Sequence, residues 1–486
     1  MTTERLYGRW ERPRSAGFFG LTWGATLLGL GLVIMIMVTV MVTRSIAVVA
    51  VVVAAAAAAF VPTVVTVGGR TVWEMASLRT QFALARARGE TEYRAGRFSR
   101  VPGAARLPGL LASSRLVEFE TPGGYRFGMI HLPRLHHYSV VFRVQPQGQD
   151  LVDQAQIDAW VAGYGQLLAA AGRDGEVVAI TSVVESVVET HLRHRREVAQ
   201  MVRPDAPEVA RTVAHQAAAL GGIGIRTEAR IAVTWRAIGR GRHDVAEQAR
   251  EVATRVQAVL SDLANAGLPA TPMPAWEVTA LVRSRYDLAA QTDIEAAGPA
   301  SNLSWTSAGP VAQSEQWGHL VHDGARSITW EMDAAPAGPV TETVLAALLR
   351  PRTDVPRKRI AVHYRPHPAD EAVDIVDSDY RDALAASQTE RGIASAAASI
   401  RVDNTGAARR EQALGAGLVR FGLLITVSDR ADADMPGIEP TIQAMATAAR
   451  LGVRRCYGSQ AAAFAAGLGV GVVLPEHATI RKRLSS

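Results

Sequence analysis

A long apolar stretch near the N-terminus constrains this chain more than any other feature. From Gly17 to Val67 the sequence contains a single charged residue, Arg44. A helix needs about 20 apolar residues to cross the hydrocarbon core of a bilayer, and this stretch is more than twice that long. Because backbone groups in lipid must satisfy their own hydrogen bonds, the stretch must be helical there. It predicts a transmembrane hairpin of two spans that turns at Thr43, Arg44 and Ser45.

Arginines on both sides of the hairpin predict its orientation. Four of them lie between Arg5 and Arg14, before the first span, and seven lie between Arg70 and Arg100, after the second. Positive charge near span ends stays on the cytoplasmic side. We therefore expect a plasma (inner) membrane protein with two spans and both termini in the cytoplasm. A cleaved signal peptide is the competing interpretation, but it would leave the second span in place.

The second span differs from the first in the size of its side chains. Six consecutive alanines, Ala54 to Ala59, occupy its middle. Small residues let helix backbones approach closely in lipid, so they favour a packing face for another helix. The alternative is an alanine-rich, weakly hydrophobic helix with no special partner. Pro62 predicts a kink at the inner end of this span.

Composition excludes several classes of site. A formal charge of +6 is small for 486 residues and gives no reason to expect direct nucleic-acid binding. Much of the basic excess flanks the hairpin, where membrane lipids are the expected partner. Cys456 is the only cysteine, which rules out an intramolecular disulfide and a zinc site built from cysteines.

The rest of the chain divides by composition and pattern. We expect six segments: a cytoplasmic tail (1–16), the transmembrane hairpin (17–67), a basic juxtamembrane helix and linker (68–108), a first α/β domain (109–270), an irregular connector (271–325) and a second α/β domain (326–486).

Both α/β domains show the same order of elements. In the first, a hairpin at 116–132 and strands at 138–145, 176–188 and 229–235 are interleaved with helices at 150–171, 207–220 and 244–266. We expect Gly172 to stop the helix at 150–171. In the second, strands at 327–332, 359–364 and 420–427 are followed by helices at 340–349, 369–399 and 437–451. Strands joined by crossover helices with mixed pairing are typical of split βαβ units, so the expected fold is α/β with two ferredoxin-like units.

No motif for catalysis, a cofactor or a metal stands out. The phosphate-binding loop needs a lysine after its glycines, and neither Lys358 nor Lys482 follows such a loop. The histidine pairs at 136–137, 191–194 and 319–322 lack a supporting carboxylate arrangement, and solvent exposure or hydrogen bonding explains them. Asp374, Asp377 and Asp379 fit a solvated helix face. We therefore expect a protein that is not an enzyme and holds no cofactor or metal.

Two motifs at the start of the chain resemble a known family. Tyr7-Gly8-Arg9-Trp10 and Phe19-Gly20-Leu21-Thr22-Trp23 lead into the double span in the manner of the PrgI-like hairpins of bacterial conjugation systems. Three later stretches resemble the non-catalytic N-terminal half of the conjugation ATPases of type IV secretion: HHYSVVFRVQPQGQDL, RSITWEMDAAPAGPV and RRCYGSQAAAFAAGLGVGVVLPEH. We therefore expect a chain without the nucleotide-binding core that follows in those ATPases. The arrangement is similar to membrane proteins of actinobacterial conjugative elements.

This resemblance implies a structural component of a conjugative, type IV-like secretion apparatus. Its partners would be a separate ATPase, other secretion subunits and copies of itself. A type VII core component of the EccE-like kind is the alternative in the transport class, and a membrane-anchored enzyme or sensor is the alternative of another class. Trp305, Trp317 and Trp330 lie in or beside the irregular connector, where they are candidates for partner contacts. The competing interpretation packs these rings onto their own domain.

Overall fold

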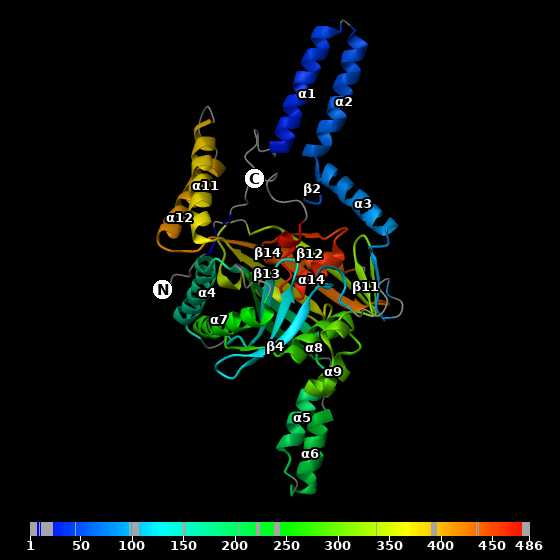
Figure 1. The fold of residues 1–486 in the computed structure, drawn as a ribbon, viewed down its shortest axis with the longest axis vertical. Helices are drawn as coiled ribbons and strands as arrows, with labels where there is room; N and C mark the ends of the chain where they lie inside the picture. Colours follow the sequence, from blue (N-terminus) through cyan, green and yellow to red (C-terminus); the bar gives the residue numbers. More distant parts are fainter. Residues whose placement is uncertain are drawn as a thin grey trace. The chain divides into compact units, whose positions relative to one another are not determined.

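The computed structural model describes residues 7–8, 10, 23–43, 45–96, 99, 106–148, 152–203, 205–219, 224–237, 244–336, 338–389, 396–433, 435 and 437–478. The chain divides into two units. Figure 1 labels their helices and strands. The sheet unit comprises residues 1–8, 91–374 and 411–477. The helical unit comprises residues 9–90, 375–410 and 478–486.

The helical unit begins with two long apolar helices. They are α1 (Trp23–Val42) and α2 (Ile46–Val64), and each contains 19 residues in an uninterrupted apolar span. The helices run antiparallel, since Gly29 near the start of α1 faces Phe60 near the end of α2. A Cβ atom on Gly29 would lie 3.0 Å from that ring, so the glycine permits the close approach.

A short hairpin connects α2 to an amphipathic helix. β1 (Thr66–Val67) and β2 (Arg70–Thr71) pair across Gly68 and Gly69, which both adopt positive φ. α3 (Val72–Ala87) then starts with a capping box: Thr71 Oγ1 accepts from Glu74 N, and Thr71 N donates to Glu74 Oε2 at 2.9 Å. These reciprocal bonds satisfy backbone donors that the first turn of a helix leaves free.

The sheet unit is built on a single antiparallel sheet. Among the described residues, thirteen strands join in antiparallel pairs. Their bounds are β3 (Glu92–Arg94), β4 (Arg115–Glu120), β5 (Arg126–Leu132), β6 (His137–Val144), β7 (Val177–Val188), β8 (Ile225–Arg236), β9 (Ala270–Pro272), β10 (Ala312–Glu315), β11 (Leu320–His322), β12 (Ala325–Ala334), β13 (Lys358–Pro366), β14 (Val419–Arg430) and β15 (Gly452–Arg455). The main path runs β3-β10-β11-β12-β14-β13-β7-β8-β6-β5-β4.

Two ferredoxin-like modules can be traced within this sheet. The first module is β6, α4 (Gln154–Asp174), β7, β8, α7 (Val245–Asn265) and β9, with strand order β9-β6-β8-β7. The second module is β12, α10 (Ala346–Leu349), β13, β14, α13 (Ile438–Ala448) and β15, with strand order β15-β12-β14-β13. Both orders follow the split βαβ pattern. The α/β class is therefore confirmed, and the two modules merge because β7 pairs with β13 along a seam.

The strands present different side chains to the two faces of the sheet. On one face, α4 and α7 cover an apolar cluster of the first module, and α10 and α13 cover one of the second. The opposite face carries α8 (Ala275–Tyr286), α14 (Gln460–Gly467) and the segment that follows α14. That second face also buries polar side chains, including Ser139, Thr234 and Arg359.

Three expectations are corrected at the level of elements. Gly172 does not stop α4; it lies inside the helix, where a Cβ atom would come 3.0 Å from His367 O, and Gly175 ends the helix with φ of 72°. The helix expected at 369–399 is two helices, α11 (Ala369–Thr389) and α12 (Ala396–Ala413). The connector expected to be irregular at 271–325 contains α8, α9 (Gln291–Ala297) and strands β10 and β11.

Candidate interaction surfaces

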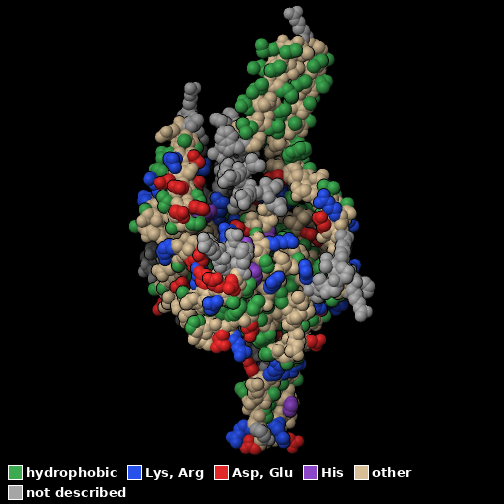
Figure 2. All heavy atoms as spheres, viewed as in Figure 1, with side chains coloured by type: hydrophobic (Ala, Val, Ile, Leu, Met, Phe, Trp, Pro, Cys, Tyr) green, Lys and Arg blue, Asp and Glu red, His purple; other side chains and the backbone are tan. Residues whose placement is uncertain are grey.

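The apolar helices α1 and α2 form the first candidate surface. Both are long and apolar enough to cross a membrane, and only 6% of each apolar span is buried. Figure 2 shows the hydrophobic side chains that cover this pair of helices. Exposing this much apolar surface to water is energetically costly, so lipid or another protein must cover it. These two helices support a membrane location by length and composition.

The motif residues expected at this hairpin are only partly described. Phe19, Gly20, Leu21, Thr22 and Arg44 lie outside the described residues, and Trp23 starts α1. Pro62 lies two residues before the end of α2, whose final turn closes with Val65 N donating to Val61 O at 3.0 Å. The kink at Pro62 stays a prediction.

The motif that precedes the hairpin contributes to the sheet unit. Tyr7 and Val340 exchange two backbone hydrogen bonds, at 2.8 and 2.7 Å. Beside them, a Cβ atom on Gly8 would lie 3.1 Å from Pro339 Cα, so a larger residue would crowd this contact. The Tyr7-Gly8 dipeptide is therefore an anchoring element of the sheet unit.

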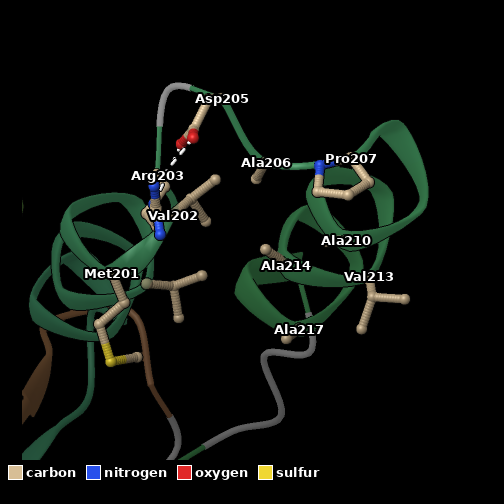
Figure 3. A pocket seen from close by; sticks show the side chains of 11 residues that line it. Met201, Val202, Arg203, Asp205, Ala206, Pro207, Ala210, Val213, Ala214 and Ala217 are labelled. Carbon is tan, nitrogen blue, oxygen red and sulfur yellow. Dashed lines mark hydrogen bonds and ion pairs between the residues drawn. The ribbon is translucent and has the colours of Figure 1, made fainter.

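A protruding pair of helices forms the second candidate surface. α5 (Leu192–Met201) and α6 (Glu208–Ala219) are inserted between β7 and β8 and enclose a cleft of about 680 Å³ (Figure 3). An ion pair of 2.8 Å between Arg203 and Asp205 spans the turn. The cleft is lined mainly by alanine, valine and methionine side chains.

This helix pair exposes large apolar side chains. Met201 and Val209 are about three-quarters exposed, and Val213 is 58% exposed. None of the described side chains of α6 is buried. An apolar stripe that its own domain does not cover is typical of a helix that docks against a partner.

A groove of about 730 Å³ lies where α5, α8 and α9 meet the ends of β6 and β8. Its volume falls in the range of small-molecule sites. Trp276, Met273 and Leu281 give it an apolar wall, and ion-paired side chains also line it. Arg143 contacts Glu277 at 2.5 Å. Burial raises the pKa of Glu277, and the neighbouring Arg143 only partly offsets this effect.

A buried ionic cluster adjoins this groove at the seam between the modules. Glu185 on β7 accepts hydrogen bonds from Arg230 at 2.8 Å, Arg285 at 2.9 Å and Arg359 at 3.4 Å. Burial acts to raise the pKa of Glu185, but the three guanidinium groups outweigh it and hold the pKa well below its usual range. The carboxylate therefore stays ionised and links β7, β8, β13 and α8.

The sequence marks the members of this cluster as charged residues within or beside apolar runs. Glu185 lies within the apolar run VVESVV, and Arg230 and Arg359 begin the runs RIAV in strands β8 and β13. A charged residue inside a strand that is buried on both faces must find a partner, because burying an unpaired charge is costly. Three such positions in adjacent strands would have predicted an ion cluster.

The three candidate tryptophans have different environments. Trp330 on β12 is fully buried, and its Nε1 donates to Glu439 Oε1 on α13 at 2.9 Å. Trp305 is 8% exposed and donates to Ser114 Oγ at 2.9 Å. These two rings therefore pack onto their own domain, as the competing interpretation holds. Trp317 is partly exposed and stacks on Tyr457 with ring centroids 5.7 Å apart.

The other titratable candidates take part in hydrogen bonds or ion pairs within the fold. His322 is buried, with Nδ1 at 2.5 Å from Tyr286 O and Nε2 at 2.8 Å from Ser327 Oγ. His194 Nε2 lies 3.1 Å from Ala217 O in the α5–α6 pair. Asp377 pairs with Arg409 across α11 and α12 at 2.7 Å. Within the described part of the chain, no three histidine, cysteine or acidic residues form a group that could hold a metal.

Comparison with known families identifies the segment around the apolar hairpin. A family described as a domain of unknown function (DUF8461) matches residues 14–74. The matched range includes α1, α2, the β1–β2 hairpin and the start of α3. No curated protein matches the chain.

Proposed function

We propose that this chain is a non-enzymatic, membrane-anchored structural component of a conjugative, type IV-like secretion or DNA-transfer apparatus. The α1–α2 hairpin crosses the membrane, both termini lie in the cytoplasm, and the sheet unit is a platform for a separate ATPase. The observation that carries the proposal is the α5–α6 pair, an inserted helical hairpin that leaves Met201, Val209 and Val213 exposed. The sequence resemblance to the non-catalytic half of conjugation ATPases supports the choice of partner.

An EccE-like component of type VII secretion is the alternative within the transport class, since it also pairs two spans with a cytoplasmic domain. The groove beside Trp276 favours a second alternative, a membrane-anchored enzyme or sensor. Neighbouring genes discriminate between the transport alternatives. A conjugation ATPase and a relaxase support the first, and small secreted helical-hairpin proteins with their own ATPase support the second.

Capture of the co-encoded ATPase by the full chain in detergent tests the platform. We expect Val209→Glu and Val213→Glu to abolish capture without lowering the melting temperature, because both side chains are exposed. Val373→Glu is the matched control, since this valine is 49% exposed on α11. Trp317→Ala tests whether the remaining candidate tryptophan contacts the ATPase. Capture that survives both α6 variants would remove α5–α6 as the docking surface, and no capture by the wild type would remove the platform.

Cysteine labelling of intact cells tests the topology. In a Cys456→Ser background, Ser45→Cys should react with an impermeant reagent, whereas Ser99→Cys should react only after the membrane is opened. The arginine asymmetry predicts this pattern. The reverse pattern would place the sheet unit outside and contradict the proposed function.

A further inference from the structure

A small cavity lies at the seam, on the sheet face that carries α8. Its volume is about 10 Å³, which is enough for one water-sized particle. Charged and hydroxyl side chains dominate its wall: Glu185, Arg285, Arg357, Arg359, Thr426 and Ser428. Because β7 and β13 pair directly here, whatever occupies the cavity contacts both modules at once.

Positive charge exceeds negative charge around this cavity. Both oxygens of Glu185 are engaged, Oε2 by Arg230 and Arg285 and Oε1 by Arg359. Arg285 has a further partner in Glu228, at 2.5 Å. Arg357 donates to the neutral amide of Gln291 at 2.8 Å, and its nearest carboxylates act on it only through space. Three guanidinium groups and one carboxylate therefore line the same small volume.

Arg359, which lines this cavity, has unused hydrogen-bond donors. Its side chain is 3% exposed, and its Nε and Nη2 atoms have no hydrogen-bond partner among the described residues. A Cβ atom on Gly467 would lie 3.6 Å from Arg359 Nε and 3.2 Å from Thr426 Oγ1, so the free donors share their space with the Thr426 hydroxyl. Burial lowers the pKa of Arg359 to about 10, so the group remains charged at neutral pH. An unpaired buried donor of this kind is costly without an acceptor.

The hydroxyl groups that line the cavity differ in whether they have a proton left to donate. His322 donates from Nδ1 to Tyr286 O, so its neutral Nε2 accepts from Ser327. Ser327 has then used its proton, and Ser428 must donate to it across 2.7 Å. Thr426 is bonded to the hydroxyl of Thr329, where either oxygen can be the donor. Thr426 can therefore add a third donor beside the two of Arg359.

We propose that this cavity binds one small monovalent anion, with chloride as the physiological candidate. Arg359 Nε, Arg359 Nη2 and Thr426 Oγ1 donate to it, and it offsets the excess charge of Arg357 and Arg359. A water molecule fits the same volume and supplies an acceptor, but it brings no charge. The bound anion stabilises the pairing of β7 with β13, independently of the proposed secretion role.

Thermal unfolding of the full chain in detergent tests this site. At constant ionic strength, replacing gluconate by chloride should raise the melting temperature by about 3 °C in a saturable manner, since gluconate is too large for the cavity. Arg359→Met keeps the apolar stem of the side chain and should abolish the chloride response. Arg352→Met is the matched control, because Arg352 is 46% exposed just before β13, and it should keep the response.

Crystals grown in bromide give a second measurement that does not depend on a variant that folds. An anomalous peak within hydrogen-bond reach of Arg359 Nε and Nη2 would support the anion site. Equal melting temperatures in chloride and gluconate would overturn the proposal, as would a cavity that contains water in bromide crystals.

Discussion

The two ferredoxin-like modules have the same strand order but different helical cover. In the first, α4 and α7 have 21 residues each, whereas in the second α10 has four residues and α13 has 11. α4 compensates for the short helix by reaching across the seam. Its Tyr164 ring packs 5.7 Å from Tyr364 on β13, and its Tyr164 hydroxyl lies 2.7 Å from Ser182 on β7. One long helix thus covers strands of both modules, so the seam is the packing unit rather than either module alone.

The insertions between the second and third strands extend this comparison. Both modules carry a helical pair there, α5–α6 in the first and α11–α12 in the second. α11 buries Ala372, Val376 and Ala383, while α6 buries none of its described residues. The same topological position therefore holds one helix pair whose first helix buries apolar side chains and another whose second helix buries none of its described residues.

The largest expected effect comes from breaking the seam. Glu185→Gln leaves Arg230, Arg285 and Arg359 buried around a neutral amide. Removing one partner of a buried ionic cluster costs about 4 kcal/mol, so we expect a large fall in the melting temperature. The control is Asp354→Asn, since the pair of Asp354 with Arg352 is nearly half exposed and should be worth less than about 1 kcal/mol. Similar melting temperatures for both variants would show that the seam does not depend on Glu185.

A smaller effect should come from the segment after α14, which crosses the first module. Gly471 has φ of 84°, and a Cβ atom there would lie 2.0 Å from Ser139 Oγ on β6. We expect Gly471→Ala to lower the free energy of unfolding by about 3 kcal/mol, from the clash and the left-handed backbone together.

The matched control for this glycine is Gly175→Ala. Gly175 has φ of 72° with nothing within 4 Å of a Cβ atom, so only the backbone cost of about 1 kcal/mol applies. Chemical denaturation of the two variants measures the difference. Equal costs would mean that the segment after α14 moves away from β6 freely.

The sequence predicted the order of elements better than their connections. Alternation in the strands and the apolar run of the hairpin are local patterns, and both were recovered. The prediction that Gly172 ends a helix was wrong. In sequence, a glycine that ends a helix cannot be distinguished from one that permits close packing against a distant segment, here Pro366 and His367. The β7–β13 seam joins residues some 174 positions apart, such as Glu185 and Arg359, and no local pattern specifies that pairing. The charged positions of the ion cluster stand out within each strand, but only the strand pairing brings them together.

Acid should destabilise the sheet unit through its buried histidines. Burial lowers the pKa of His137 to about 3 and that of His131 to about 4. The unfolded chain takes up protons below its ordinary histidine pKa of about 6.5, while these native side chains do not. The contribution of these neutral histidines to the free energy of unfolding is therefore fully present above pH 6.5. It falls as the pH drops toward 4, by about 2 kcal/mol per histidine at pH 5.

Unfolding at pH 7 and pH 5 measures this dependence. His137→Gln should reduce the difference between the two pH values, whereas His215→Gln, at an exposed position on α6, should leave it unchanged. An unchanged difference in His137→Gln would contradict the assignment of the acid sensitivity to this residue.

The smallest expected effect concerns the two inserted helix pairs. Arg409 on α12 contacts Asp377 at 2.7 Å and lies 5.5 Å from the centroid of the Tyr380 ring on α11. Because Arg409 is 55% exposed, Arg409→Ala should cost only about 0.5 kcal/mol globally. Hydrogen exchange should nevertheless become faster in α11 and α12, since this side chain links the two helices. Arg203→Ala is the counterpart on α5–α6, where the Arg203–Asp205 pair spans a turn and is more than two-thirds exposed. It should leave exchange in α5 and α6 unchanged. If Arg203→Ala loosens its helices as much as Arg409→Ala does, the two insertions are held by the same kind of contact, and the contrast drawn between them fails.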